Sequence, residues 1–142
     1  MNPIVRNILA VITGIIVGSV VNMALISLGH AIIPLPEGAD VSTIEKMKES
    51  VHLFGSEQFI FPFIAHALGT LAGAFAAAKL AATSKMRIAL GIGVYFLIAG
   101  IYMCFLMPAP VWFMALDVLV AYIPMAYLGG KLAVGAVKNS VA

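Results

Sequence analysis

Charged side chains are scarce in this sequence, and their scarcity excludes most water-soluble folds. Only 10% of the 142 residues are charged, whereas a soluble domain has roughly 25%. Hydrophobic residues make up 63% of the chain, so few polar groups remain to cover a water-facing surface. We therefore expect residues 1–142 to form a single membrane domain, with the lipid bilayer as its main solvent. The net charge of +2 is too small for a nucleic-acid-binding surface.

Cysteine is nearly absent, and metal-binding patterns are weak. Cys104 is the single cysteine, so no intrachain disulfide can form, and we interpret it as a small buried hydrophobe. Glu45, Glu49 and His52 have the spacing of a metal-binding helix face, but we interpret them as a solvated polar face. His66 is the only histidine within an apolar run, which argues against a bis-histidine haem. We predict no metal, no cofactor and no catalytic residues, and we do not expect an enzyme.

Long apolar runs are what the chain has instead. Four of them, at residues 7–29, 59–82, 86–106 and 111–133, reach the ~20 residues that a transmembrane helix needs. Pro124 lies inside the last run and should kink it, because proline cannot donate the backbone hydrogen bond of a regular helix. The pattern predicts an all-α fold, an integral membrane four-helix bundle.

The loop between the first two runs, residues 30–58, holds a shorter helical pattern. The sequence Ser42-Thr43-Ile44-Glu45 resembles a capping box, which predicts a helix of about three turns that ends near Gly55. Its apolar and charged residues fall on opposite faces. We expect a short amphipathic helix lying on the outer membrane surface or over the bundle.

Charge asymmetry predicts the orientation of the spans. The 30–58 loop is acidic, whereas six of the eight basic residues flank the other ends of the runs. Basic residues mark cytoplasmic ends, so we expect both termini in the cytoplasm and the loop outside a bacterial inner membrane. The six basic residues are Arg6, Lys79, Lys85, Arg87, Lys131 and Lys138.

Small residues form seams on two of the predicted spans. Gly14 and Gly18 are four residues apart in the first run, and Gly69 and Gly73 are four apart in the second. This spacing allows helices to approach closely in lipid. The seams suggest helix packing, either inside the chain or between chains.

Three polar residues fall at one depth. Asn22, His66 and Asp117 each lie seven residues, about 10 Å, inside the outer end of a span, and Tyr102 lies somewhat nearer the surface. An unpaired carboxylate in hydrocarbon costs at least ~2.5–3.5 kcal/mol, so we expect Asp117 to meet His66 or Asn22. Two states are open: an ionised pair, or a protonated Asp117 that donates a hydrogen bond.

The segment FPFIAHALGTLAGAFAAAKL, residues 61–80, carries the one resemblance we find. Together with the four-span layout, it resembles small four-span proteins of bacterial inner membranes that are described only as uncharacterised. The resemblance implies a span pattern and a membrane location. It implies no activity, cofactor or site residue.

These observations leave three functional hypotheses. The first is a structural or accessory component, either a homo-oligomer or part of a larger membrane complex, because the glycine seams are prominent. The second is a small transporter or proton-linked conduit that uses the Asp117, His66 and Asn22 layer. The third and weakest is a lipid- or quinone-binding protein with its pocket under the amphipathic helix.

Overall fold

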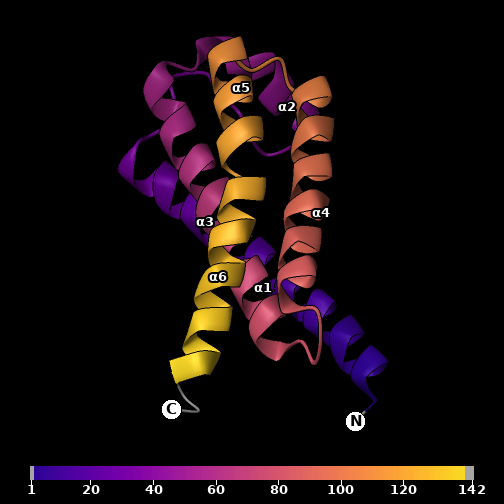
Figure 1. Ribbon diagram of the computed structural model, residues 1–142. Helices are drawn as coiled ribbons and strands as arrows, with labels where there is room; N and C mark the ends of the chain where they lie inside the picture. Colours follow the sequence, from indigo (N-terminus) through magenta and orange to yellow (C-terminus); the bar gives the residue numbers. More distant parts are fainter. Residues whose placement is uncertain (1, 140–142) are drawn as a thin grey trace.

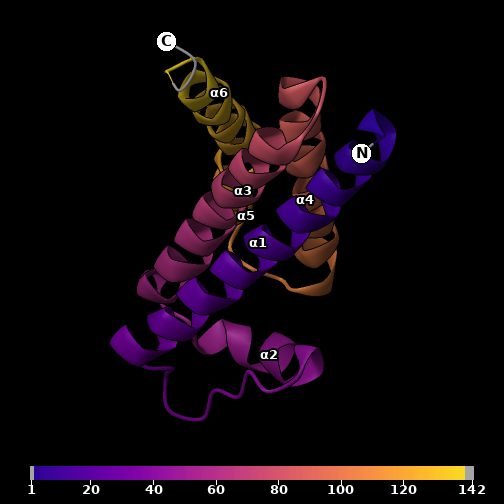
Figure 2. The same cartoon turned by 90° about the horizontal axis from the view of Figure 1, so that it is seen from below.

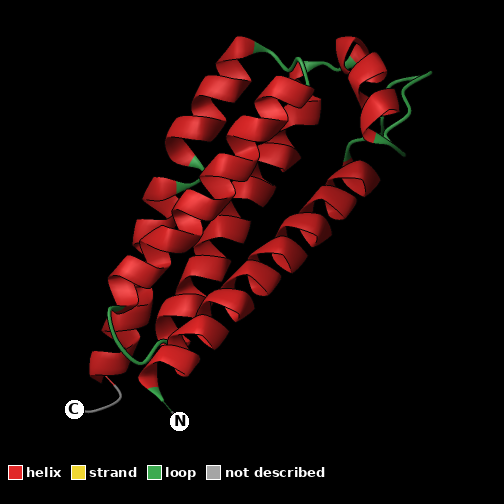
Figure 3. Ribbon diagram, turned by 90° about the vertical axis from the view of Figure 1, so that its right-hand side faces the viewer, coloured by secondary structure: helices red, strands yellow, loops and turns green. Residues whose placement is uncertain are grey.

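The structure, a computed structural model, describes residues 2–139. Most of this part of the chain is helical, and it contains no β-strand. Loops gather at the two ends of the molecule, apart from one break within a spanning segment (Figure 3). The elements follow in the order α1 (Pro3–Ile32), α2 (Ile44–Ser50), the 3₁₀ turns η1 (Val51–Leu53) and η2 (Ser56–Phe59), α3 (Ile60–Leu80), α4 (Lys85–Leu106), α5 (Val111–Val120) and α6 (Ile123–Asn139).

Four segments of the described chain are long and apolar enough to cross a membrane. They are α1, Ser56–Leu80 (η2 with α3), α4, and Val111–Ala136 (α5 with most of α6). The shortest has 22 residues and is therefore about 33 Å long, enough to span a ~30 Å hydrocarbon core. The chain is a multi-pass membrane protein, and the predicted all-α four-helix bundle is confirmed.

Both chain termini lie at one end of the bundle, called the terminal end below (Figure 1). The α2 segment lies at the opposite end, called the cap end. Helix α1 begins at Pro3, four residues earlier than expected. The side chain of Asn2 caps it by accepting a hydrogen bond from the Ile4 backbone N–H at 2.9 Å, and a proline in the first turn needs no donor there.

The glycine seams bring α1 and α3 into direct backbone contact (Figure 2). A Cβ added at Gly14 would lie 2.7 Å from the carbonyl oxygen of Gly73, and one at Gly73 would lie 2.6 Å from that of Gly14. A Cβ at Gly18 would lie 2.9 Å from the carbonyl oxygen of Gly69. All four predicted seam glycines are therefore used within the chain, where they allow two helices to touch.

Polar side chains lock the same two helices together at the terminal end. The side-chain oxygen of Asn7 accepts a hydrogen bond from Ala82 N–H at 2.8 Å, and its amide donates to Thr83 Oγ1 at 2.9 Å. The Nε–H group of Arg6 donates to the Leu80 carbonyl at 2.8 Å. These bonds satisfy backbone groups that the end of α3 leaves free.

The centre of the bundle is built from small side chains. Its main buried cluster contains six alanines and Ile92, contributed by α3, α4 and α6. Gly93 of α4 lies against Ala126 of α6, where an added Cβ would lie only 2.5 Å from the alanine Cβ. Small residues at the contact let helix backbones approach closely, which is how helices associate where lipid provides no hydrophobic driving force.

The last spanning segment is broken near Pro124, as the sequence predicts. Helix α5 ends at Val120 and α6 begins at Ile123, with a turn between them. Pro124 has no N–H to donate to the Val120 carbonyl, so the regular hydrogen-bond ladder is interrupted there. Tyr122 lies in this turn.

The α2 segment covers the cap end of the bundle, but it differs from its prediction. It has seven residues rather than about three turns, and it continues into the 3₁₀ turn η1. Its N-cap is Thr43, which accepts a hydrogen bond from Lys46 N–H at 3.2 Å, so the capping box predicted at Ser42 and Glu45 is wrong. The backbone N–H of Ser42 instead donates to the carboxylate of Asp40 at 2.8 Å. The N-cap of α2 therefore lies one residue later than predicted.

Asp40 closes this segment into a compact loop. Its carboxylate pairs with Lys46 Nζ at 2.7 Å, and its backbone exchanges hydrogen bonds with the Ser50 hydroxyl at 2.9 and 3.2 Å. The hydrogen bonds from Lys46 and Ser42 hold the pKa of Asp40 well below its usual value, and Asp40 raises the pKa of Lys46. All of these bonds lie within residues 40–50, so they fold the segment back on itself.

Candidate functional site

Asp117 and His66 form a pair between α5 and α3, in which Asp117 is buried and His66 is partly exposed. The Nδ1 atom of His66 lies 2.9 Å from Oδ1 and 3.0 Å from Oδ2 of Asp117. Asp117 is only 3% exposed. An isolated carboxylate is costly to bury, so the contact with an imidazole provides the partner that it needs. The structure thus brings together the two residues that the sequence singled out as partners.

Tyr122 completes this group. Its hydroxyl donates a hydrogen bond to Oδ2 of Asp117 at 2.7 Å, and its ring stacks on the imidazole of His66 with 5.9 Å between ring centroids. Tyr122 is 3% exposed. Asp117 therefore interacts with two neighbours that also touch each other, which limits the orientations open to the histidine ring. His66, Asp117 and Tyr122 are called the polar triad below.

The tyrosine that reaches Asp117 is not Tyr102. Its depth along the span would allow Tyr102 to join the polar layer, but it is 63% exposed on α4. Counting residues gives the depth of a side chain along its helix, but it does not tell which face of the helix packs against the other helices. Tyr122 lies five residues after Asp117, a spacing that does not share a face in a regular helix. The sequence signal that could have found Tyr122 is Pro124, because the helix break that it predicts includes Tyr122.

Asn22 does not join the triad. Its side-chain oxygen is buried and has no hydrogen-bond partner in the part of the chain that the structure describes. It lies beside Gly69, one helical turn from His66 along α3. The expected contact between Asp117 and a carboxamide is therefore not formed, and only the imidazole meets the carboxylate.

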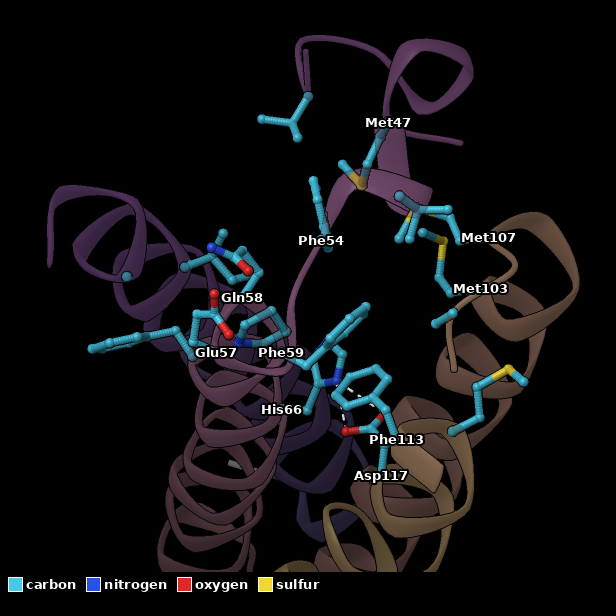
Figure 4. A pocket seen from close by; sticks show the side chains of 18 of the residues that line it. Met47, Phe54, Glu57, Gln58, Phe59, His66, Met103, Met107, Phe113 and Asp117 are labelled. Carbon is cyan, nitrogen blue, oxygen red and sulfur yellow. Dashed lines mark hydrogen bonds and ion pairs between the residues drawn. The ribbon is translucent and has the colours of Figure 1, made fainter. Parts of the chain in front are cut away.

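A cavity of about 210 Å³, called the cap cavity, lies between α2 and the polar triad (Figure 4). Its walls are mostly apolar, with Met47 above and Phe59 and Phe113 beside it. The polar residues His30, Glu57 and Gln58 also line it. His66 and Asp117 supply polar atoms at its base. It also borders Cys104, which forms no hydrogen bond with the described residues.

A second cavity of about 310 Å³, called the lateral cavity, lies among α1, α3 and α4. Asn22 and Thr70 line it, and Thr70 Oγ1 is also buried without a partner among residues 2–139. His66, Gly100 and Met103 border both cavities. The polar triad therefore lies between the two cavities, with Asp117 lining the cap cavity, Tyr122 the lateral cavity and His66 both.

The geometry determines which atom of His66 is available for chemistry. Nδ1 faces Asp117, and Nε2 has no hydrogen-bond partner within the described chain. Both states expected from the sequence fit these distances. In the ionised pair both ring nitrogens of the imidazolium are donors, and when Asp117 carries the proton Nε2 is again an N–H. A neutral imidazole protonated at Nδ1 beside an ionised Asp117 is a third state, and in it Nε2 presents a lone pair. In each state the histidine offers one oriented hydrogen-bonding group that can also take up or release a proton.

Other chemistries find less support in the geometry. Within the described residues, no group of three or more His, Cys, Asp or Glu side chains is placed to hold a metal ion. Nucleophilic catalysis needs a hydroxyl or thiol within hydrogen-bond reach of the base, and Nε2 has no such neighbour in residues 2–139.

Comparison with protein-family models, curated proteins and solved structures gave no match.

Proposed function

We propose that this protein binds a lipid-soluble small molecule in the cap cavity and holds its polar end at His66. The observation that carries the proposal is a mostly apolar cavity of about 210 Å³ that has His66 and Asp117 in its wall, with Tyr122 behind them holding Asp117. Ligand sites are usually concave and apolar, with a few well-placed polar groups that orient the ligand. Among the hypotheses from the sequence, lipid or quinone binding beneath the amphipathic helix agrees best with this geometry.

Size and chemistry narrow the ligand class. An apolar cavity of ~150 Å³ is enough to bind benzene, so the cap cavity accommodates one substituted ring or a similar headgroup. The available Nε2 of His66 pairs with a hydroxyl or a carbonyl, depending on its protonation. Phenols, quinols and quinones with apolar tails share these features. Asp117 and Tyr122 hold the imidazole ring of His66 in place before a ligand binds, so less conformational entropy is lost on binding.

A proton-linked conduit is a second candidate. The observation in its favour is that His66 borders both cavities, so that one titratable group is reachable from two sides. On this hypothesis Asp117→Asn abolishes a proton-coupled flux in liposomes while the circular dichroism spectrum stays unchanged. Unchanged flux in that variant would exclude the triad as a proton carrier.

An accessory or homo-oligomeric role rested on the glycine seams. Gly14, Gly18, Gly69 and Gly73 all face each other across the α1–α3 contact, so they are not available to a second chain. The seams therefore give no reason to prefer association. We place ligand binding first for that reason.

We also propose that the terminal end faces the cytoplasm of a bacterial inner membrane. The basic residues Arg6, Lys79, Lys85, Arg87 and Lys131 lie near this end, whereas the acidic loop lies at the cap end. This distribution follows the positive-inside rule. The side chain of Lys138 lies outside the described residues. Accessibility of single cysteines introduced at Glu37 and Thr83, measured in intact cells, tests the orientation.

Binding is tested with two probes that differ in one hydroxyl group, 4-hexylphenol and hexylbenzene. The protein is titrated calorimetrically in lipid nanodiscs, with protein-free nanodiscs as the blank for partitioning. We expect 4-hexylphenol to bind the tighter, and His66→Gln to weaken it by up to about tenfold, the worth of one hydrogen bond. Glutamine can still donate to Asp117, but it presents no second nitrogen to the cavity.

His52→Gln is the matched control, because His52 is exposed in η1 and lines neither cavity. His52→Gln should leave the affinities for 4-hexylphenol and hexylbenzene unchanged. The affinity for hexylbenzene should also be unchanged in His66→Gln. Equal affinity for the two probes, or equal effects of the two variants, would refute the proposal. Mass spectrometry of the protein purified from its membranes then identifies any lipid-soluble molecule that accompanies it.

A further inference from the structure

Two buried polar groups outside the triad have no partner in the described chain. Thr70 is only 2% exposed, yet its hydroxyl forms no hydrogen bond. The side-chain oxygen of Asn22 is buried and unpaired as well. Buried polar groups are nearly always paired, and each unpaired one lowers stability. Both belong to the wall of the lateral cavity, so a molecule within that cavity can supply the missing partner.

The position of the lateral cavity limits what that molecule is. Its rim includes the exposed residues Ser19 and Met23 of α1 and Tyr95 and Ala99 of α4. These residues belong to membrane-spanning segments, so the cavity opens towards hydrocarbon rather than water. A molecule that enters from this side must dissolve in lipid and also carry a polar group.

The lateral cavity and the cap cavity share His66 in their walls. His66 and Thr70 are four residues apart on α3, so they share a face and are separated by about one helical turn, ~5.4 Å. Asn22 faces the same stretch of α3 from α1, next to Gly69. One ring with two polar substituents is long enough to reach both groups of residues.

We infer that Asn22 and Thr70 form a second hydrogen-bonding subsite for the ligand of the cap cavity. The ligand enters from the bilayer between α1 and α4 and carries two polar groups about one helical turn apart. One group meets Nε2 of His66, and the other meets the Thr70 hydroxyl and the Asn22 carboxamide. This inference rests on the proposed function, because it specifies the ligand of the same site.

The test adds a second hydroxyl to the probe. Affinities of 4-hexylresorcinol and 4-hexylphenol are measured in nanodiscs for the wild-type protein and for the double variant Thr70→Val with Asn22→Leu. Both substitutions keep nearly the same size and remove the polar atoms. We expect the wild type to prefer the resorcinol by up to about tenfold and the double variant to lose this preference, with its affinity for 4-hexylphenol unchanged.

Thr13→Val is the control, because Thr13 lies on α1 and lines neither cavity. If the double variant does not fold, Thr70→Val alone is measured. A preference for the resorcinol that survives loss of the Thr70 hydroxyl overturns the second subsite and leaves the proposed function intact. Equal wild-type affinities for the two phenols also overturn it. Failure of 4-hexylphenol to bind better than hexylbenzene overturns the proposed function itself.

Discussion

Tyr122 lies directly against the α-carbon of Gly100, with no space for a side chain between them. A Cβ at Gly100 would overlap both the hydroxyl oxygen and the ring of Tyr122. The same hydroxyl donates to Asp117 at 2.7 Å. Because Gly100 of α4 has no side chain, Tyr122 has the space to form this hydrogen bond. Gly100 is therefore a positioning residue for the polar triad.

Gly100→Ala should displace the Tyr122 hydroxyl and destabilise the protein by about 1–3 kcal/mol, the usual cost of overpacking a core. The control is Gly91→Ala on the same helix, because a Cβ there meets nothing within 4 Å. We expect that control to be neutral or to gain up to ~1 kcal/mol of helix propensity. Reversible unfolding in mixed micelles measures both. Equal stabilities for the two variants would contradict the contact.

Tyr122→Phe removes one hydrogen bond to a carboxylate without changing the ring. The expected loss of stability is about 1.5–3 kcal/mol if Asp117 is ionised and nearer 1 kcal/mol if it is neutral, so the size of the effect also reports its charge. Tyr102→Phe is the matched control, since Tyr102 is 63% exposed, and it should change stability by less than ~0.5 kcal/mol. A larger effect at Tyr102 would mean that the wrong tyrosine has been assigned to the triad.

Gly73→Ala should separate α1 from α3, because the new methyl group would lie 2.6 Å from the backbone oxygen of Gly14. Backbone cannot move aside as a flexible side chain can, so we expect a loss of about 1–3 kcal/mol. The loss should not depend on protein concentration, because the contact lies within one chain. Gly135→Ala, where a Cβ meets open space, is the control. A loss that grows on dilution would instead indicate a contact between chains.

The loop that Asp40 closes through Lys46 and Ser42 should open at acidic pH. The fold lowers the pKa of Asp40, so the stabilisation that its carboxylate provides is present above the ordinary aspartate pKa of ~3.9. It is lost as the pH falls below that value towards the lowered pKa. In the Asp40→Asn variant the loop should be open already at neutral pH. Trypsin should then cleave after Lys46 and Lys48 faster than in the wild-type protein. Glu37→Gln in the same loop should cleave at the wild-type rate, and equal rates for both variants would rule out that Asp40 closes the loop.

A bulky residue at the rim of the lateral cavity should slow binding. Ala99 lines this cavity, and its neighbour Ile98 is exposed and lines neither cavity. We expect Ala99→Trp to lower the association rate of 4-hexylphenol in stopped-flow measurements, while Ile98→Trp leaves it unchanged. Unaltered rates in both would place the route to the cap cavity elsewhere, beneath α2.

Local sequence determined the spans, the four seam glycines, the break at Pro124 and the need of Asp117 for a partner, because hydropathy, helical spacing and a missing backbone donor depend on neighbouring residues alone. Tertiary structure alone decided that Tyr122 rather than Tyr102 reaches the carboxylate, that Asn22 does not contact it, and that His66 borders two cavities. Each of these depends on how far every helix is rotated about its own axis against the others. Residue counting gives the depth of a side chain, whereas packing decides the direction in which it points.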